Sequence, residues 1–412
     1  MLHSAMVLWI GLAIETHGAA ADEPAAGASA ALRLEDGDRV ILVGATFLER
    51  DRHHGRIEEA LRARFPGTKL SFRDLAWPGD TVAVQMRPLD FGSFESHLRA
   101  QRPTVVIVSY GMTEAFGGEK ARDRFLADYR KLLDVIDKTE ARVILIGPHR
   151  HEALGLPLPD PRRHNENLRL YSKAVAQLAV ERERPFVDLF EQFELKETPP
   201  IAYPRTENGI HLSDFGYVEA AGVIAREVGL LAPTWRIDLD ASGKVIDAAG
   251  VAVKEIERAD RSLRFTAIAS ALPPDMPADA PPSGEWKRPE HVLSIAGLPP
   301  GDYALRIGGD EAVVASAARW QEGMSITRGP DFAQAARLRD AIRRKDRLFF
   351  DRWRAHNGEY IYGRRAKAGG NNSGNPAFTA EFARLDRLLE EADRQLDELS
   401  RPEPHQYELV PR

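Results

Sequence analysis

Five short strand-like runs, most of them almost wholly apolar, alternate with amphipathic segments in the first half of the chain. This alternation restricts the fold more than any other feature of the sequence, because a run without polar residues at every second position is typical of a strand buried on both faces. The runs occupy residues 40–43, 70–75, 104–108, 142–146 and 185–189. The segments between them repeat apolar residues at helical spacing, most clearly over residues 125–136. Strands that alternate with helices in this way predict an α/β fold, with helices on both faces of a parallel sheet.

The amino-acid composition excludes several classes of partner and of functional site. The chain has 412 residues, of which 43% are hydrophobic and 29% charged, which is typical of globular proteins. Its net charge of −6 leaves no basic excess for binding nucleic acid, so we expect no nucleic-acid partner. The absence of cysteine excludes disulfides, thiolate zinc sites, cysteine nucleophiles and covalently attached haem.

The N-terminus indicates export. Residues 5–14 form a short apolar run, and small residues at 18–21 follow it as in a signal-peptide cleavage site. We therefore expect a signal peptide over residues 1–21 and a secreted or periplasmic protein; the alternative is the apolar start of a cytosolic chain. The run is too short to span a bilayer, and no other stretch is apolar enough, so we expect no transmembrane segment in the mature chain.

Changes in composition divide the rest of the chain. An Ala-rich flexible leader over residues 22–35 precedes the α/β domain, which we expect over residues 36–232. Alternating segments and turn signals over residues 233–328 predict a small antiparallel β unit with a Pro-rich loop. Charged, amphipathic patterns over residues 329–412 predict a helical C-terminal region.

Functional sites of open α/β sheets lie at the carboxyl ends of the strands. Residues with reactive or hydrogen-bonding groups occur there, and the candidate catalytic set is Thr46, Gly79, Thr113, Asn208 and His211. A neutral imidazole can serve as general base and a hydroxyl beside it as nucleophile, which are the roles expected of His211 and Thr46. Gly79 allows a backbone N–H to approach a developing oxyanion, and Thr113 offers a hydroxyl donor. Asn208, three residues before the histidine, is placed to orient the imidazole.

This order of blocks resembles the SGNH/GDSL hydrolase superfamily over roughly residues 38–230, and Gly79 and His211 match its pattern unchanged. The resemblance implies a flavodoxin-like three-layer α/β/α sheet, ester hydrolysis, and no metal or cofactor. The sequence departs from the family at its catalytic blocks. Thr46 stands where the family has its nucleophilic serine, Thr113 where it has an oxyanion asparagine, and Asn208 where it has an aspartate.

The departures leave the chemistry open. In the serine-protease triad, changing the aspartate to asparagine lowers turnover by about 10⁴, and losing one side-chain oxyanion donor costs about 10²–10³ more in subtilisin. Glu207 or Asp214 is a candidate to supply the missing carboxylate, and Glu114 is expected beside the pocket. Each residue also has a structural alternative: a turn or helix cap for Thr46, a helix cap for Thr113, a turn for Gly79 and for Asn208, and a capping or core position for His211. The pair His149 and His151 reads as part of a solvated loop.

Two functions follow from these patterns. The first is an ester hydrolase acting on a small-molecule or polysaccharide ester, with acylated carbohydrate as the expected substrate. The second is a catalytically silent binding or assembly module, which keeps the cleft and contacts a protein partner through its C-terminal region.

Overall fold

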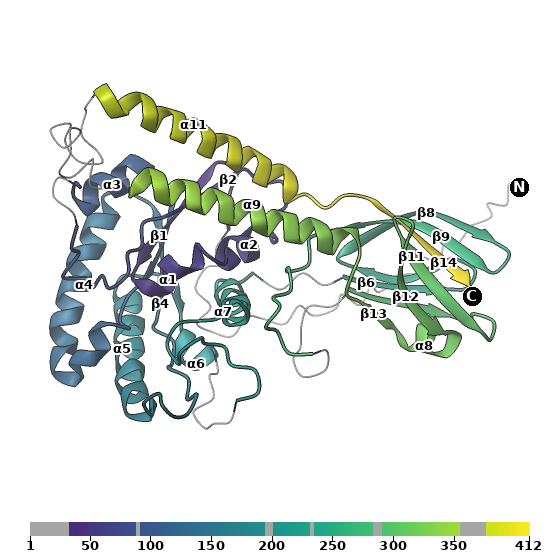
Figure 1. Ribbon diagram of the computed structural model, residues 1–412, viewed down its shortest axis with the longest axis horizontal. Coiled ribbons are helices and arrows are strands. Elements are labelled where there is room, and N and C mark those ends of the chain that lie inside the picture. The colour runs from purple at the N-terminus through teal and green to yellow at the C-terminus, as the bar shows by residue number, and fades with distance from the viewer. Residues whose placement is uncertain (1–32, 88–90, 194–200, 231–234, 283–290, 355–375) are drawn as a thin grey trace, which may run out of the picture.

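The computed structural model describes residues 33–87, 91–193, 201–230, 235–282, 291–354 and 376–412 (Figure 1). An α/β domain lies beside a β-rich domain, and two long helices run from one to the other across the α/β domain. The predicted signal peptide and most of the predicted leader lie outside the described residues. Within them, no helix is both long and apolar enough to cross a membrane.

The α/β domain is built on a five-stranded sheet of order β2-β1-β3-β4-β5, in which every neighbouring pair is parallel. This is the flavodoxin-like order, and it confirms the predicted fold class. The last strand is shorter than the sequence suggested, because the Asp188 side chain accepts hydrogen bonds from the amides of Phe190 and Glu191 and so starts a short helix. The strands are β1 (Asp38–Gly44), β2 (Leu70–Asp74), β3 (Val105–Ser109), β4 (Arg142–Ile146) and β5 (Phe186–Val187).

Alternate residues of each strand face two separate cores, one on either side of the sheet. Val40 and Leu42 of β1 pack with apolar residues of α1, α2 and α7, whereas Ile41 and Val43 pack with those of α3, α4 and α5. Burial on both faces explains why these strands carry no polar alternation. The helices are α1 (Thr46–Asp51), α2 (Arg56–Arg62), α3 (Phe94–Gln101), α4 (Arg122–Asp137), α5 (Arg162–Glu181), α6 (Leu189–Gln192) and α7 (Asp214–Glu227).

The β-rich domain consists of a four-stranded sheet, order β13-β10-β6-β7, and a five-stranded sheet, order β12-β11-β14-β9-β8, in which β14 is the C-terminal strand His405–Pro411. One core contains residues of both sheets, among them Trp235, Phe265 and Tyr407, so the sheets form a sandwich. β6 and β10 pair in parallel, which differs from the purely antiparallel unit that we expected. The elements are β6 (Trp235–Asp240), β7 (Val245–Ala249), β8 (Val251–Ala259), β9 (Ser262–Ala269), β10 (His291–Ala296), β11 (Asp302–Ile307), β12 (Asp310–Ser316), α8 (Ala317–Glu322) and β13 (Met324–Ile326).

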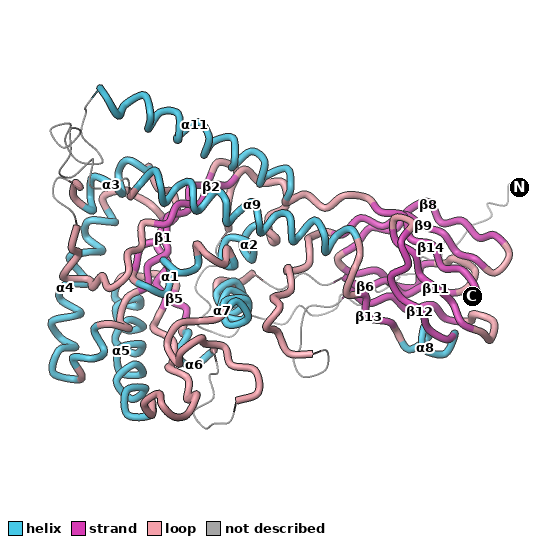
Figure 2. Tube along the Cα trace, viewed as in Figure 1, coloured by secondary structure: helices cyan, strands magenta, loops and turns pink. Residues whose placement is uncertain are grey.

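The C-terminal region ties the two domains together. Helices α9 (Pro330–Trp353) and α11 (Pro376–Leu399) lie side by side over the α/β domain (Figure 2). Phe349 and Trp353 of α9 are buried in the core beneath them. The chain then returns to the sandwich, where β14 (His405–Pro411) pairs with both β11 and β9. The region predicted to be helical therefore ends in a central strand of the second sheet.

Buried ion pairs connect the two C-terminal helices, α9 and α11, to α2. The Lys345 ammonium of α9 lies 2.5 Å from Glu58, and Arg62 contacts both Glu58 and Asp397 of α11 at 2.7 Å. The Lys345 side chain is fully buried. Because each buried charge has an oppositely charged partner, the desolvation cost of bringing these helices together is offset.

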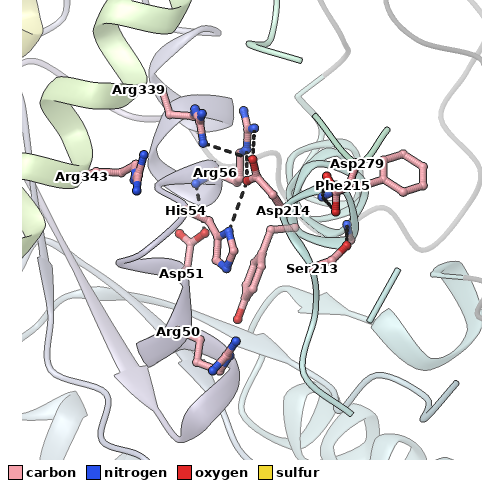
Figure 3. A network of polar contacts seen from close by, with 12 residues as sticks. Arg50, Asp51, His54, Arg56, Ser213, Asp214, Phe215, Asp279, Arg339 and Arg343 are labelled. Atoms are coloured by element: carbon pink, nitrogen blue, oxygen red, sulfur yellow. Dashed lines mark hydrogen bonds and ion pairs between the residues drawn. The ribbon is translucent and has the colours of Figure 1, made fainter. Parts of the chain in front are cut away.

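A second ionic network surrounds Asp214, the first residue of α7 (Figure 3). Arg56 donates from Nε and Nη2 to the two Asp214 oxygens at 2.9 and 2.8 Å, and Arg339 of α9 donates at 3.2 Å. His54 Nδ1 lies 3.2 Å from the same carboxylate. Although burial acts to raise it, these hydrogen bonds and the Arg56 charge hold the pKa of Asp214 below its ordinary value. Asp214 is thus committed to the contact between α2, α7 and α9.

Replacing Arg56 with methionine tests how much this network contributes to the free energy of unfolding. The Arg56 side chain is 1% exposed and also pairs with Glu59, so its loss removes the guanidinium from the buried Glu59 and from the partly buried Asp214. We expect the free energy of unfolding in urea to fall by about 3–5 kcal/mol. Arg226→Met removes a half-exposed pair with Glu227 and serves as the control, with little change expected. Equal effects of the two substitutions would contradict the assignment.

Candidate active site

A pocket of about 230 Å³ opens at the carboxyl edge of the parallel sheet. Three of the five predicted site residues, Thr46, Thr113 and His211, line it, and Gly79 and Asn208 each contact one of these three. The structure therefore brings the five predicted residues together. The full lining is Ala45, Thr46, Phe47, Arg50, Ser109, Tyr110, Met112, Thr113, Phe116, His149, His151, Ile210, His211, Leu212 and Tyr217.

Thr46 begins helix α1, directly after the first strand. The backbone N–H of Gly79 donates to Thr46 Oγ1 at 3.3 Å. Gly79 has a φ of +75°, and a Cβ added to it would meet no atom within 4 Å. The glycine is thus favoured by the left-handed backbone conformation that aims this N–H, and not by lack of space. Ala45, not Thr46, occupies the N-cap position of α1.

The Asn208 side chain holds the His211 ring. Its Oδ1 accepts hydrogen bonds from the backbone amides of Ile210 and His211 at 3.2 and 2.9 Å, which identifies this atom as the oxygen. The other end, Nδ2, lies 3.2 Å from His211 Nδ1. An amide nitrogen only donates, so Nδ1 must accept, and the neutral imidazole carries its proton on Nε2. An aspartate at this position would favour the opposite tautomer.

Glu152 holds the turn that carries Asn208, a role that the sequence analysis missed. Its carboxylate accepts hydrogen bonds from the amides of Arg205 and Thr206, each at 3.0 Å, and from the Thr206 hydroxyl at 2.7 Å. Its own amide donates to the Gly209 carbonyl at 2.7 Å. Glu152 therefore fixes the turn before His211 from the loop that follows β4. Its position shortly after a predicted strand was the only signal in the sequence.

Within the described part of the chain, neither of the two carboxylates proposed to replace the missing aspartate, those of Glu207 and Asp214, hydrogen-bonds to His211. Asp214 belongs to the ionic network around Arg56. Glu207 pairs with Arg50 at 2.6 Å. Glu114 accepts hydrogen bonds from the amides of Gly111 and Val82 at 3.0 and 2.9 Å, so it fastens two loops at the rim.

Thr113 lines the pocket without capping the short 3₁₀ helix η1 (Glu114–Gly117) that follows it. Its hydroxyl has no hydrogen-bond partner among the described residues. This differs from the capping alternative, and it leaves the hydroxyl available to a ligand.

His149 and His151 are buried, so the prediction of a solvated loop was wrong. They are 2% and 6% exposed and line the pocket wall. The Asn165 side chain from α5 bonds both the amide and the carbonyl of His151, at 2.8 and 3.0 Å, which holds the loop inward. Burial lowers the pKa of His149 to about 4 and that of His151 to about 3, so both are neutral at pH 7. Their place directly after the fourth strand was the available signal.

His211 is also biased toward its neutral form. Burial lowers its pKa below the ordinary value, the nearby Arg50 charge acts in the same direction, and Glu207 opposes them. Among the described residues, no cluster of three or more His, Asp or Glu side chains has a geometry that could hold a metal ion.

The three-layer sheet and the grouping of a hydroxyl, a glycine amide and a histidine at its carboxyl edge define an SGNH-type hydrolase domain. Residues 38–218 match the model of the GDSL-like lipase/acylhydrolase family. No curated protein matches the chain.

Solved structures extend the likeness beyond this domain. A gut microbial diltiazem-metabolizing enzyme superposes with a TM-score of 0.73 at 17% identity, covering 94% of this chain and 100% of its own. The fold of the whole described chain, sandwich and tail helices included, is thus shared. An acetylxylan esterase from Geobacillus stearothermophilus (catalytic mutant) aligns at 20% identity with a TM-score of 0.39, over 48% of this chain and 97% of its own.

Changing Asn208 to aspartate tests the arrangement around His211. One carboxylate oxygen can keep both backbone hydrogen bonds while the other accepts from Nδ1–H, which moves the proton away from Nε2. We expect Asn208→Asp to raise kcat/KM for ester hydrolysis at least about tenfold, since the tautomer governs the general base.

Asn167→Asp is the matched control, because it makes the same charge change on α5 without touching the His211 turn. An unchanged or lower rate in a folded Asn208→Asp variant would contradict the tautomer assignment.

Proposed function

We propose that this chain is a slow ester hydrolase that acts on acylated carbohydrate, with Thr46 as nucleophile and His211 as general base. The observation that supports this best is the contact between the Gly79 N–H and Thr46 Oγ1, in a pocket that His211 also lines. A hydroxyl that already faces a backbone donor is placed to attack a carbonyl whose oxygen turns toward that donor. The pocket volume of about 230 Å³ suits a short acyl group with part of its alcohol.

In the proposed reaction, Thr46 Oγ1 attacks the acyl carbonyl while His211 removes the hydroxyl proton. The Gly79 N–H and the Thr113 hydroxyl bind the negative oxygen of the tetrahedral intermediate. The intermediate then collapses, His211 returns the proton to the leaving alcohol, and an acyl-threonine ester remains. Water repeats the sequence in the second half-reaction, releasing the carboxylic acid and restoring Thr46.

The reaction is slow because His211 must first change tautomer. With the proton on Nδ1, two donors would face each other across the 3.2 Å between Asn208 Nδ2 and His211 Nδ1. Turning the amide over would instead break its two bonds to the backbone amides. Each buried donor left unpaired costs about 1–3 kcal/mol, so the base-competent tautomer is a minor state.

A catalytically silent binding module is the second candidate. No hydrogen bond joins Thr46 Oγ1 to His211 among the described residues, and the favoured tautomer presents a donor at Nε2 in place of a base. Such a pocket can bind a carbonyl or an anion without cleaving the ligand. In that case the sandwich and the tail helices would supply contacts to a protein partner. Under either function we propose export, because the apolar N-terminus has the pattern of a signal peptide.

Hydrolysis of 4-nitrophenyl acetate and of acetylated xylan by the purified chain tests the proposal. We expect slow release of acetate that falls to the uncatalysed rate in both Thr46→Ala and His211→Ala, because each removes one partner of the proton transfer. His53→Ala, at an exposed histidine, is the control. Equal rates in all four proteins would support the silent module instead.

The pH profile gives a separate check. The general base must be neutral, and burial lowers the pKa of His211, so activity should persist below the ordinary histidine pKa of about 6.5 and fall at lower pH. In Asn208→Asp the new carboxylate favours the charged imidazole, so the acid limb of kcat/KM should move to higher pH. Identical profiles for the two proteins would show that His211 is not the titrating group.

A further inference from the structure

The described residues that line the candidate pocket carry a positive charge that no acidic residue of the lining balances. Its lining contains one arginine and three histidines, and no aspartate or glutamate belongs to the described residues that line it. Since the histidines are biased toward neutrality, Arg50 is the permanent charge of the lining. A pocket with one fixed cation and several imidazole groups is suited to a ligand that carries negative charge.

Arg50 lies one helical turn after Thr46 on α1, so the two side chains share a face of the helix. Its side chain is 26% exposed, and its Nε is buried without a hydrogen-bond partner among the described residues. The Arg50 side chain therefore belongs to the pocket lining and is partly exposed, whereas its Nε–H donor is covered in this conformation.

Glu207 forms an ion pair with the same guanidinium, through Nη2. Glu207 Oε2 lies 2.6 Å from Arg50 Nη2, and the glutamate side chain is 51% exposed. Ion pairs this exposed contribute about 0–1 kcal/mol, so another carboxylate can displace Glu207 at little cost. If the Arg50 side chain shifts as it leaves Glu207 and so uncovers Nε, a ligand carboxylate that contacts both Nε and Nη2 would form the bidentate pair that guanidinium groups prefer.

We propose that the pocket recognises carboxylate-bearing carbohydrate esters, of the type of an acylated uronic acid, with Arg50 leaving Glu207 to bind the sugar carboxylate. This inference rests on the proposed function, because it names the substrate class of the same site. The acyl group would lie inside, beside Thr46 and Thr113. The sugar would lie at the mouth, where Arg50 is partly exposed. Glu207 then serves as a built-in competitor that keeps Arg50 in place when no ligand is bound.

The test compares acetate release from methyl acetyl-glucuronide and methyl acetyl-glucoside, which differ in the carboxylate. We expect the parent chain to prefer the glucuronide by at least about tenfold in kcat/KM. Arg50→Gln should lower this preference ratio about tenfold, whereas Glu207→Gln should raise it, because the competitor is gone. Arg52→Gln is the matched control: Arg52 pairs with Glu49 at the end of the same helix and is not part of the pocket lining.

Calorimetric titration with glucuronate and with succinate separates this inference from the proposed function. Glucuronate binding that weakens in Arg50→Gln and strengthens in Glu207→Gln would support the inference even if no ester were cleaved. Tighter binding of succinate than of glucuronate would overturn it, by placing the carboxylate on the acyl side. Ester hydrolysis with equal preference for the two sugars in all variants would overturn it as well, and would leave the hydrolase proposal standing.

Discussion

The amide of Asn208 has its oxygen committed to two backbone N–H groups, and the chemistry of the pocket depends on that commitment. Because the oxygen is occupied, the nitrogen must face His211, and the ring must accept from it at Nδ1. The proton is thereby left on the ring nitrogen that a general base needs free. In the proposed hydrolase, this amide is therefore one of the departures that slow the reaction, together with the threonines at positions 46 and 113.

The surrounding fold holds this arrangement from several directions. Glu152 fixes the turn before His211 from the loop after β4. On the opposite side, Arg354 at the end of α9 donates to the Ala76 carbonyl at 2.5 Å and lies over the Trp77 ring. The same guanidinium lies 3.5 Å from Glu49 on α1. The C-terminal region therefore supports both the turn that carries Gly79 and the helix that carries Thr46.

Local patterns in the sequence were sufficient to predict the parallel sheet, because its strands are buried on both faces and read as apolar runs. They were also sufficient to place Thr46, Gly79 and His211 at one edge, since the carboxyl ends of parallel strands meet there. The partners of Asp214 could not be predicted, because Arg56 and Arg339 are distant in the chain. For the same reason β14 was missed: a seven-residue strand between β11 and β9 is defined by its neighbours, and it follows a long helix. The burial of His149 and His151 could not be predicted either, because their loop is held inward by Asn165, which lies on helix α5.

Nitrogen NMR of the imidazole rings tests the central claim most directly. The two nitrogens of His211, assigned by comparison with His211→Ala, report which one carries the proton at neutral pH. The account predicts a protonated Nε2 and an unprotonated Nδ1 that accepts from the Asn208 amide. A proton on Nδ1 would contradict it, and would make His211 an ordinary general base despite the asparagine.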